Sequence, residues 1–291
     1  MIDLHCHSLF SDGEYMPDEL LKKAENLGLS YFSITDHNNC FAYEKMDTGL
    51  FKGTLIKGVE IVTSFDKHII EILGYGVNTD KINEWNREEL KKERVYAEKI
   101  YNNLIETFEK NGIKYTGNIN IKEIIKKEDP TGVFKQYLYN DLLKYKENTE
   151  IIGEDILESY GSFNKKGLNS PTSVLFINEH VRFPKLKDTI NLIHENGGLC
   201  FLAHIYEYNV NNHIEFLKKI MDTVKLDGVE TYHHSFSEGQ REEISEYADR
   251  VNLYKSGGSD FHGKLKPNIN LGLDLKISDE LVKPWIGKIK L

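Results

Sequence analysis

The sequence predicts an α/β barrel of seven strands, interrupted by a helical insertion. Short apolar, strand-like segments alternate with amphipathic helical segments in residues 1–80, and the same alternation returns in residues 186–291. The charged stretch between them, residues 81–185, shows helical patterns and no clear strand. Strands that alternate with helices favour a parallel sheet with helical crossovers. We therefore expect one catalytic barrel, residues 1–80 with 186–291, and one helical subdomain, residues 81–185.

The individual elements follow from apolar spacing and from residues that start or stop a helix. Pro17 opens the first helical pattern and Gly28 follows its end, while Gly197 and Gly198 follow a later one. The predicted strands cover residues 1–6, 31–35, 54–61, 69–77, 199–203, 227–232 and 251–256. The clearest predicted helices cover residues 17–27, 86–110, 186–196, 214–224 and 238–250.

Composition limits the class of protein and of partner. The formal net charge of -9 argues against stable binding to duplex DNA, although bound metal cations would still allow a small anionic substrate. No apolar run reaches the roughly 20 residues that span a bilayer, and the N-terminus shows no secretory signal. The three cysteines are odd in number and sparse, which fits a reducing compartment. We expect a cytoplasmic enzyme that binds no membrane.

The first strand ends in the strongest chemical signal of the chain, His5-Cys6-His7. Side chains along a strand alternate between faces, so both imidazoles are expected on one face and Cys6 in the core on the other. Two imidazoles side by side form half of a divalent-metal site. If this motif stood alone, a hydrogen-bonded pair of histidines would be the preferred interpretation.

Later strands add groups of the same kind near their ends. They are Asp36 and His37, Glu60, His68 and Glu71, His204, and Asp260 with His262. The carboxyl ends of barrel strands meet at one mouth, where barrel active sites lie. Imidazole nitrogens mixed with carboxylate oxygens suit manganese, iron or zinc. The sequence therefore predicts a metal centre at this mouth.

These motifs, together with Asp12, resemble in order those of the PHP (polymerase and histidinol phosphatase) family. The resemblance covers about residues 1–80 and 186–291, and implies a distorted (β/α)7 TIM-like barrel. The helical insertion resembles that of the branch with nucleotide phosphatases and a stand-alone 5'-3' exonuclease. The resemblance implies two or three divalent ions (Mn, Fe or Zn). It assigns one ion to His5, His7, Glu60 and Asp260, a second to Asp12, His37 and His262, and a third to Glu60, His204 and Glu71.

This chain departs from the family pattern at Glu71, where a histidine is usual. A carboxylate can also bind a cation, and a supporting role for Glu71 is the alternative. Asp36 is expected to orient a ligand histidine.

Four further residues are candidates for contact with substrate. Lys135, in the insertion, stands where relatives often supply an arginine for phosphate, and a solvated lysine is the alternative. His68 is a second candidate substrate contact. Of His233 and His234, one is expected to protonate the leaving group and the other to lie at the surface. Asp260 is also a candidate to act on the attacking water.

The remaining histidines, His180, His194 and His213, are expected to have no role in the site.

The predicted activity is metal-dependent hydrolysis of a phosphate ester. The preferred substrate class is a small phosphomonoester such as a nucleotide or a nucleoside bisphosphate, because the chain is acidic. The alternatives are a 5'-3' exonuclease on short RNA or DNA, a histidinol-phosphate phosphatase, and a metal-stabilised domain without activity.

Overall fold

The structure is a computed structural model, and it describes residues 1–117, 119–126, 130–170, 172–177, 182–272 and 276–291. The chain forms two compact units. The first contains residues 1–86 and 183–291, and the second contains residues 87–182. The sequence placed the two boundaries at 80/81 and 185/186. Each unit is described below by itself.

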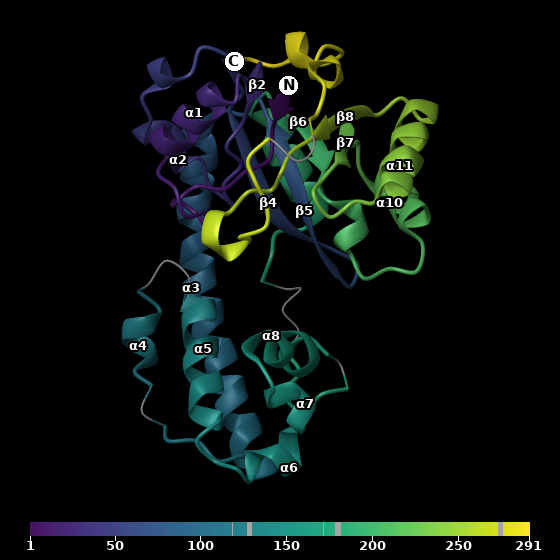
Figure 1. Cartoon of the computed structure of the whole chain (residues 1–291). Helices are drawn as coiled ribbons and strands as arrows, with labels where there is room; N and C mark the ends of the chain where they lie inside the picture. Colours follow the sequence, from purple (N-terminus) through teal and green to yellow (C-terminus); the bar gives the residue numbers. More distant parts are fainter. Residues whose placement is uncertain (118, 127–129, 171, 178–181, 273–275) are drawn as a thin grey trace. The chain divides into compact units, whose positions relative to one another are not determined.

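Most of the elements of the described residues are labelled in Figure 1. The strands are β1 (Ile2–Asp3), β2 (Tyr31–Phe32), β3 (Thr54–Leu55), β4 (Gly58–Phe65), β5 (His68–Tyr75), β6 (Leu199–Leu202), β7 (Gly228–Tyr232) and β8 (Tyr254–Gly257). The helices are α1 (Pro17–Asn26), α2 (Phe41–Lys45), α3 (Thr79–Asn111), α4 (Ile121–Ile124), α5 (Pro130–Leu142), α6 (Asn148–Ile152), α7 (Glu154–Leu157), α8 (Tyr160–Ser162), α9 (Leu186–Glu195), α10 (His213–Thr223) and α11 (Glu238–Arg250).

The first unit has a mixed α/β fold built on two sheets. One sheet has the order β1-β2-β3 and is parallel, and the other has the order β4-β5-β6-β7-β8. The expectation that all strands run parallel is wrong, because β5 pairs antiparallel with both β4 and β6. Only Asp66 and Lys67 separate β4 from β5, and two residues form a hairpin but not a crossover. The predicted strand 54–61 is also two strands, β3 and β4.

Strand alternation sorts apolar and acidic side chains onto opposite faces of the five-stranded sheet. Val59 and Ile61 of β4 are buried in a core shared with α9, α10 and α11. Glu60 lies between them in sequence and therefore faces the other way. Glu71 of β5 and Glu230 of β7 share this inner face with Glu60, as the registers of the ladders through β5 and β6 show. Three carboxylates are thus gathered on one face by the sheet itself.

The inner face of the sheet continues from these acids into an apolar core. Along β5, Leu73 and Tyr75 follow Glu71 at alternate positions and are buried. Tyr75 stacks on Trp285, with ring centroids 5.4 Å apart, and Phe201 of β6 contacts both rings. This packing gives the acidic positions a rigid, apolar support.

The described residues of the second unit form helices around a core of their own. The core joins the apolar side of α3, including Leu104 and Phe108, to Phe134 and Leu138 of α5. The exposed side of α3 carries ion pairs between lysines and glutamates spaced three residues apart. None of the described helices is both long and apolar enough to cross a membrane.

Candidate metal centre

His5 and His7 point their Nε2 atoms at the same two carboxylates. The His5 Nε2 atom lies 3.2 Å from Glu60 Oε1 and 3.5 Å from Asp260 Oδ1. The His7 Nε2 atom lies 3.2 Å from Glu60 Oε2 and 3.2 Å from Asp260 Oδ1. Gly258 makes this convergence possible, because a Cβ atom there would come within 2.3 Å of the His5 backbone nitrogen. The structure therefore brings the four residues of the first predicted ion together.

The nitrogens of this cluster fit a divalent ion better than a hydrogen-bonded network. The Nε2 atoms of His5 and His7 and the Nδ1 atom of His37 are buried and have no hydrogen-bond partner among the described residues. They nevertheless lie 3.2 to 3.5 Å from carboxylate oxygens. Two ligand atoms about 2.1 Å from one ion, at tetrahedral or octahedral angles, lie about 3.0 to 3.4 Å apart. These side chains could therefore hold an ion such as Zn²⁺ or Mn²⁺.

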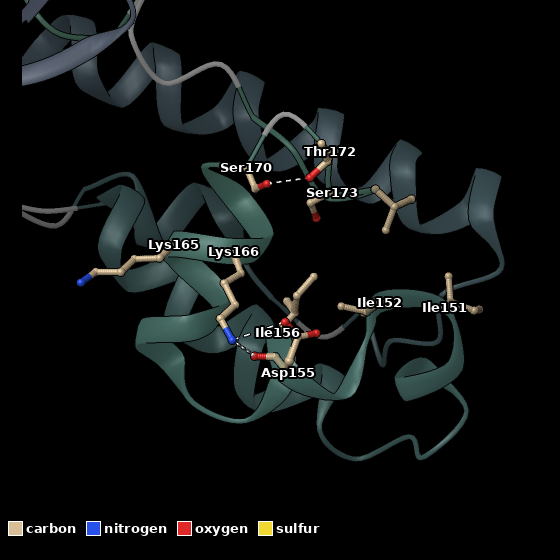
Figure 2. Close-up of a pocket in the computed structure, with 10 residues that line it drawn as sticks. Ile151, Ile152, Asp155, Ile156, Lys165, Lys166, Ser170, Thr172 and Ser173 are labelled. Atoms are coloured by element: carbon tan, nitrogen blue, oxygen red, sulfur yellow. Dashed lines mark hydrogen bonds and ion pairs between the residues drawn. The ribbon is translucent and has the colours of Figure 1, made fainter. Parts of the chain in front are cut away.

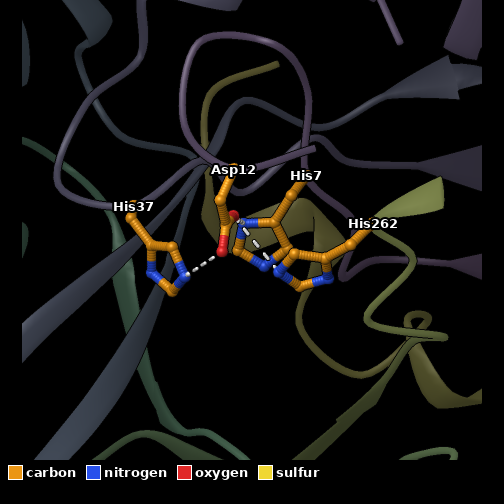
Figure 3. Close-up of side chains that lie close together, drawn as sticks. All are labelled: His7, Asp12, His37 and His262. Atoms are coloured by element: carbon orange, nitrogen blue, oxygen red, sulfur yellow. Dashed lines mark ion pairs between the residues drawn. The ribbon is translucent and has the colours of Figure 1, made fainter. Parts of the chain in front are cut away.

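A second group surrounds the Asp12 carboxylate. Figure 3 shows this carboxylate between His37 on one side and His7 and His262 on the other. The Asp12 Oδ1 atom lies 3.2 Å from His262 Nε2 and 3.6 Å from His7 Nδ1, and Oδ2 lies 3.8 Å from His37 Nε2. The Asp12 side chain is 46% exposed, so this part of the cluster is open to solvent.

A third group joins Glu60, Glu71 and His204. The His204 Nε2 atom lies 2.9 Å from Glu60 and 3.1 Å from Glu71, and Glu71 also lies 3.7 Å from His37 Nδ1. Glu71 is therefore near the position where the sequence placed a third ion. His204 and Asp260 have positive φ angles, 21° and 54°, in a region that non-glycine residues rarely adopt. Such strain persists only where the surrounding structure holds it, and it is common at functional sites.

Charge and burial control protonation within the cluster. Burial disfavours the protonated form of His7, but the Asp260 and Glu60 carboxylates beside its ring outweigh it and raise its pKa to about 9. Burial likewise opposes protonation of His5, yet nearby carboxylates raise its pKa well above the ordinary value. Burial alone would raise the pKa of Glu60, but the surrounding histidines lower it well below its usual range. Without metal, His5 and His7 are thus imidazolium groups paired with carboxylates.

Glu230 supports the centre and was missed from the sequence. It is fully buried, and its two oxygens lie 3.0 Å from His5 Nδ1 and 2.8 Å from the backbone nitrogen of His204. An acceptor on one ring nitrogen leaves the other free to bind a cation. A signal was available, because Gly228-Val229-Glu230 repeats the tripeptide Gly58-Val59-Glu60.

Asp36 is linked to His7 through a serine. Its carboxylate accepts hydrogen bonds from the hydroxyls of Ser8 and Ser11, both at 2.6 Å. The Ser11 hydroxyl in turn lies 3.3 Å from His7 Nδ1. The predicted orienting role of Asp36 is therefore consistent with this geometry, with Ser11 as the intermediate. Cys6 is buried, and its Sγ atom lies 3.5 Å from the Ser33 carbonyl.

His233 and His234 follow β7, beside Asp260. His233 is buried, and its Nε2 atom lies 3.2 Å from Asp260 Oδ2. His234 is half-buried, so it is the more exposed residue of the pair. Burial, followed by the charge of His233, lowers the pKa of His234 to about 4. His234 is therefore neutral near pH 7, which makes it a poor proton donor.

The two predicted substrate contacts, His68 and Lys135, lie in different units of the chain. The His68 ring lies edge-on against Phe216, with centroids 5.0 Å apart. Lys135 lies in α5 of the second unit, where it is buried, and its phosphate-binding role stays a prediction. His194 pairs with Asp227 at 2.6 Å. His213 Nε2 lies 3.2 Å from the Tyr208 carbonyl, and His180 lies outside the described residues.

The second unit has a pocket of its own, of about 550 Å³ (Figure 2). Its lining combines isoleucines with Lys166, Ser170, Thr172 and Ser173. Lys166 turns toward Asp155, with an ion-pair distance of 3.3 Å, and Lys165 points away from the pocket. The histidine and carboxylate groups of the candidate metal centre all belong to the first unit.

The motifs and their convergence agree with a known family. The family model described as PHP domain matches residues 3–161, which is more than half of the chain. The chain belongs to the PHP domain family. The resemblance predicted from the motifs is thereby confirmed.

Relatives of known name are similar to this member of the family over most of its length. The 5'-3' exoribonuclease of Haemophilus influenzae is 28% identical over 97% of both chains. The 3',5'-nucleoside bisphosphate phosphatase of Chromobacterium violaceum is 24% identical over 90% of this chain and 87% of that protein. A solved structure from Bifidobacterium adolescentis, described with the words metal-dependent phosphoesterase, has 22% identity and a TM-score of 0.65, and covers 100% of this chain and 96% of that one. The predicted class of enzyme, a phosphoesterase, is confirmed at the level of the family.

Proposed function

We propose that the centre holds two or three divalent ions. His5, His7, Glu60 and Asp260 would hold the first, Asp12, His37 and His262 the second, and Glu60, Glu71 and His204 the third. The observation that supports this assignment is the convergence of unpartnered imidazole nitrogens on shared carboxylates. The two sheets of the first unit would close into the distorted barrel expected for the family. The bridges Cys6–Phe261 and His37–Glu60 are the links that support this closure.

The chain would hydrolyse phosphate esters of ribonucleotides, and the 5' end of a short RNA is the first candidate substrate. The relative aligned over 97% of both chains is named for that activity. The acidic net charge disfavours long polyanions, but a few terminal nucleotides require only local compensation. The half-exposed Asp12 leaves the centre accessible to such an end.

The residues of the chain divide the work of hydrolysis between binding and orientation. Bound divalent ions would supply an activated water and offset the charge that develops on phosphorus. Glu230 and the Asp36–Ser11 pair would fix the rings of His5 and His7. His233 Nε2 donates to Asp260 Oδ2 and so would fix this carboxylate. The surrounding sheet would keep these groups in place before substrate arrives.

A nucleoside bisphosphate is the second candidate substrate. The Chromobacterium violaceum relative, aligned over 90% of this chain, is named for hydrolysis of that class. The two candidates differ in the bond that is broken. Trimming of RNA cuts a phosphodiester and releases a mononucleotide, whereas a phosphatase cuts a monoester and releases inorganic phosphate.

The test uses Mn²⁺-loaded protein with three substrates of one base composition. They are a 5'-phosphorylated RNA pentamer, the matched DNA pentamer and adenosine 3',5'-bisphosphate. We expect mononucleotides from the RNA and a lower rate on the DNA, measured by anion-exchange chromatography. Release of inorganic phosphate from the bisphosphate alone would favour the second candidate. Asp260→Asn should abolish either activity, while Asp249→Asn, at an exposed carboxylate, should not. Absence of product from all three substrates would contradict the proposal.

A further inference from the structure

Lys266 contacts a carboxylate of the candidate centre from the loop after β8. Asp260 turns Oδ1 toward the Nε2 atoms of His5 and His7, and its Oδ2 atom is shared by His233 Nε2 and Lys266 Nζ. The Lys266 side chain is 34% exposed, so its amine is not enclosed. The Lys266 ammonium group thus lies at the edge of the candidate metal centre.

The neighbouring lysine provides a contrast. Lys264 is two residues earlier in the same loop, and its amine pairs with Glu14 while its side chain is 87% exposed. Lys264 therefore lies away from Asp260, and Lys266 is directed toward it. Burial lowers the pKa of Lys266, but contact with Asp260 outweighs it and raises the pKa above the ordinary value. The amine is charged at neutral pH.

A divalent ion and the Lys266 ammonium would compete for the same carboxylate. Like charges a few ångströms apart repel strongly where solvent is partly excluded. An ion held by Asp260 would therefore weaken the hold of that carboxylate on Lys266. The flexible four-carbon stem and the partial exposure allow the amine to turn toward another anion beside the centre.

We propose that Lys266 binds the phosphate group of the substrate once the centre is loaded, and is held by Asp260 when it is not. This inference rests on the proposed function, because it names a contact of the same site. Lysine binds phosphate as a point charge and accepts it in many orientations. Lys266 would thus fill the role that the sequence assigned to Lys135. No atom of Lys266 would take part in bond breaking, so it is a substrate-binding residue.

Calorimetry with two probes tests this proposal. Inorganic phosphate is titrated into Mn²⁺-loaded protein, and Mn²⁺ is titrated into metal-stripped protein, for the wild type, Lys266→Met, Lys266→Arg and the control Lys264→Met. Loss of one charged hydrogen bond to phosphate should weaken phosphate binding about tenfold or more in Lys266→Met. Lys266→Arg should keep most of the affinity, and Lys264→Met should match the wild type. Affinity of Lys266→Met for Mn²⁺ should be equal or higher, because a competing cation is removed.

Two results would overturn the proposal. Phosphate affinity of Lys266→Met equal to that of Lys264→Met would show that Lys266 does not contact phosphate. Weaker Mn²⁺ binding by Lys266→Met would show that Lys266 only supports Asp260. If Lys266→Met fails to fold, Lys266→Gln is measured in its place with the same two criteria. If the wild type releases no product from any substrate, the proposed function fails, while phosphate titration still decides the role of Lys266.

Discussion

Replacement of Glu230 by glutamine tests whether orientation of His5 affects metal binding, because it changes none of the proposed ligands. Glu230 contacts no ion in the proposed assignment, yet it accepts from both the His5 ring and the His204 backbone. Both donors are N–H groups, and a carboxylate offers each of them an oxygen. Glutamine has nearly the same shape but offers one acceptor and one NH₂ group. One of the two buried donors would then face another donor.

The size of the effect follows from burial. Glu230 is fully buried, so water cannot replace the lost acceptor. A lost hydrogen bond to a charged group costs about 1.5 to 3 kcal/mol of folding free energy. Loss of the group that orients a ligand histidine weakens metal binding about 10- to 100-fold. We therefore expect Glu230→Gln to fold, with lower stability and weaker Mn²⁺ binding.

Mn²⁺ titration and thermal unfolding of the metal-free protein measure the two effects separately. Glu243→Gln is a matched control, because Glu243 pairs with the Tyr206 hydroxyl away from the cluster. Wild-type affinity for Mn²⁺ in Glu230→Gln would refute the argument that Glu230 orients His5. Loss of stability alone would reduce Glu230 to a structural residue.

Three further predictions concern the ligands and their packing. Glu71→His should keep or increase turnover, because it removes a negative charge from the centre. Glu71→Ala should lower the occupancy of the third ion in anomalous diffraction, and unchanged occupancy would favour a two-ion site. Gly258→Ala should destabilise the protein by about 1 to 3 kcal/mol in chemical denaturation, because its Cβ atom would collide with His5, while Gly239→Ala, with open space around it, should not. Because the pKa of His7 is higher in the folded, metal-free protein than in the unfolded chain, protonation of His7 stabilises the fold. This contribution is complete at pH values below the pKa of His7 in the unfolded chain, and it is lost as pH rises through about 9. Thermal stability without metal should therefore fall between about pH 7 and 10, while Mn²⁺ affinity should rise toward pH 9, and a flat affinity profile would contradict the assignment of His7 as a ligand.

Local patterns predicted the ligand residues because strand geometry is local. Alternation predicted from the sequence puts His5 beside His7, and their rings do lie 5.4 Å apart although β1 ends at Asp3. The same alternation along β4 turns Glu60 away from its apolar neighbours. The antiparallel hairpin was missed because alternation does not depend on strand direction. The decisive signal was the two-residue connection Asp66-Lys67, which is too short for a crossover.

Residues that support the site from a distance were harder to predict. Glu230 lies inside a strand, where an acid has no local signature until its partner is known. Lys266 lies in a loop, and its approach to Asp260 depends on how that loop returns to the sheet. Closure of the two sheets into the proposed barrel would also depend on pairings between distant strands, which the sequence pattern does not encode.

The order in which the ligands occur along the chain affects how the centre can form during synthesis. Asp3, two residues before the first ligand, binds the backbone of Ser259, which is 256 residues away and adjacent to Asp260. During synthesis His5 and His7 emerge more than 200 residues before Asp260 and His262, and domains generally fold in the order in which they leave the ribosome. Premature loading with a tightly binding metal is thereby limited to partial sites. The second unit, encoded by one continuous segment with its own core, has all its residues before more than half of the first unit is made.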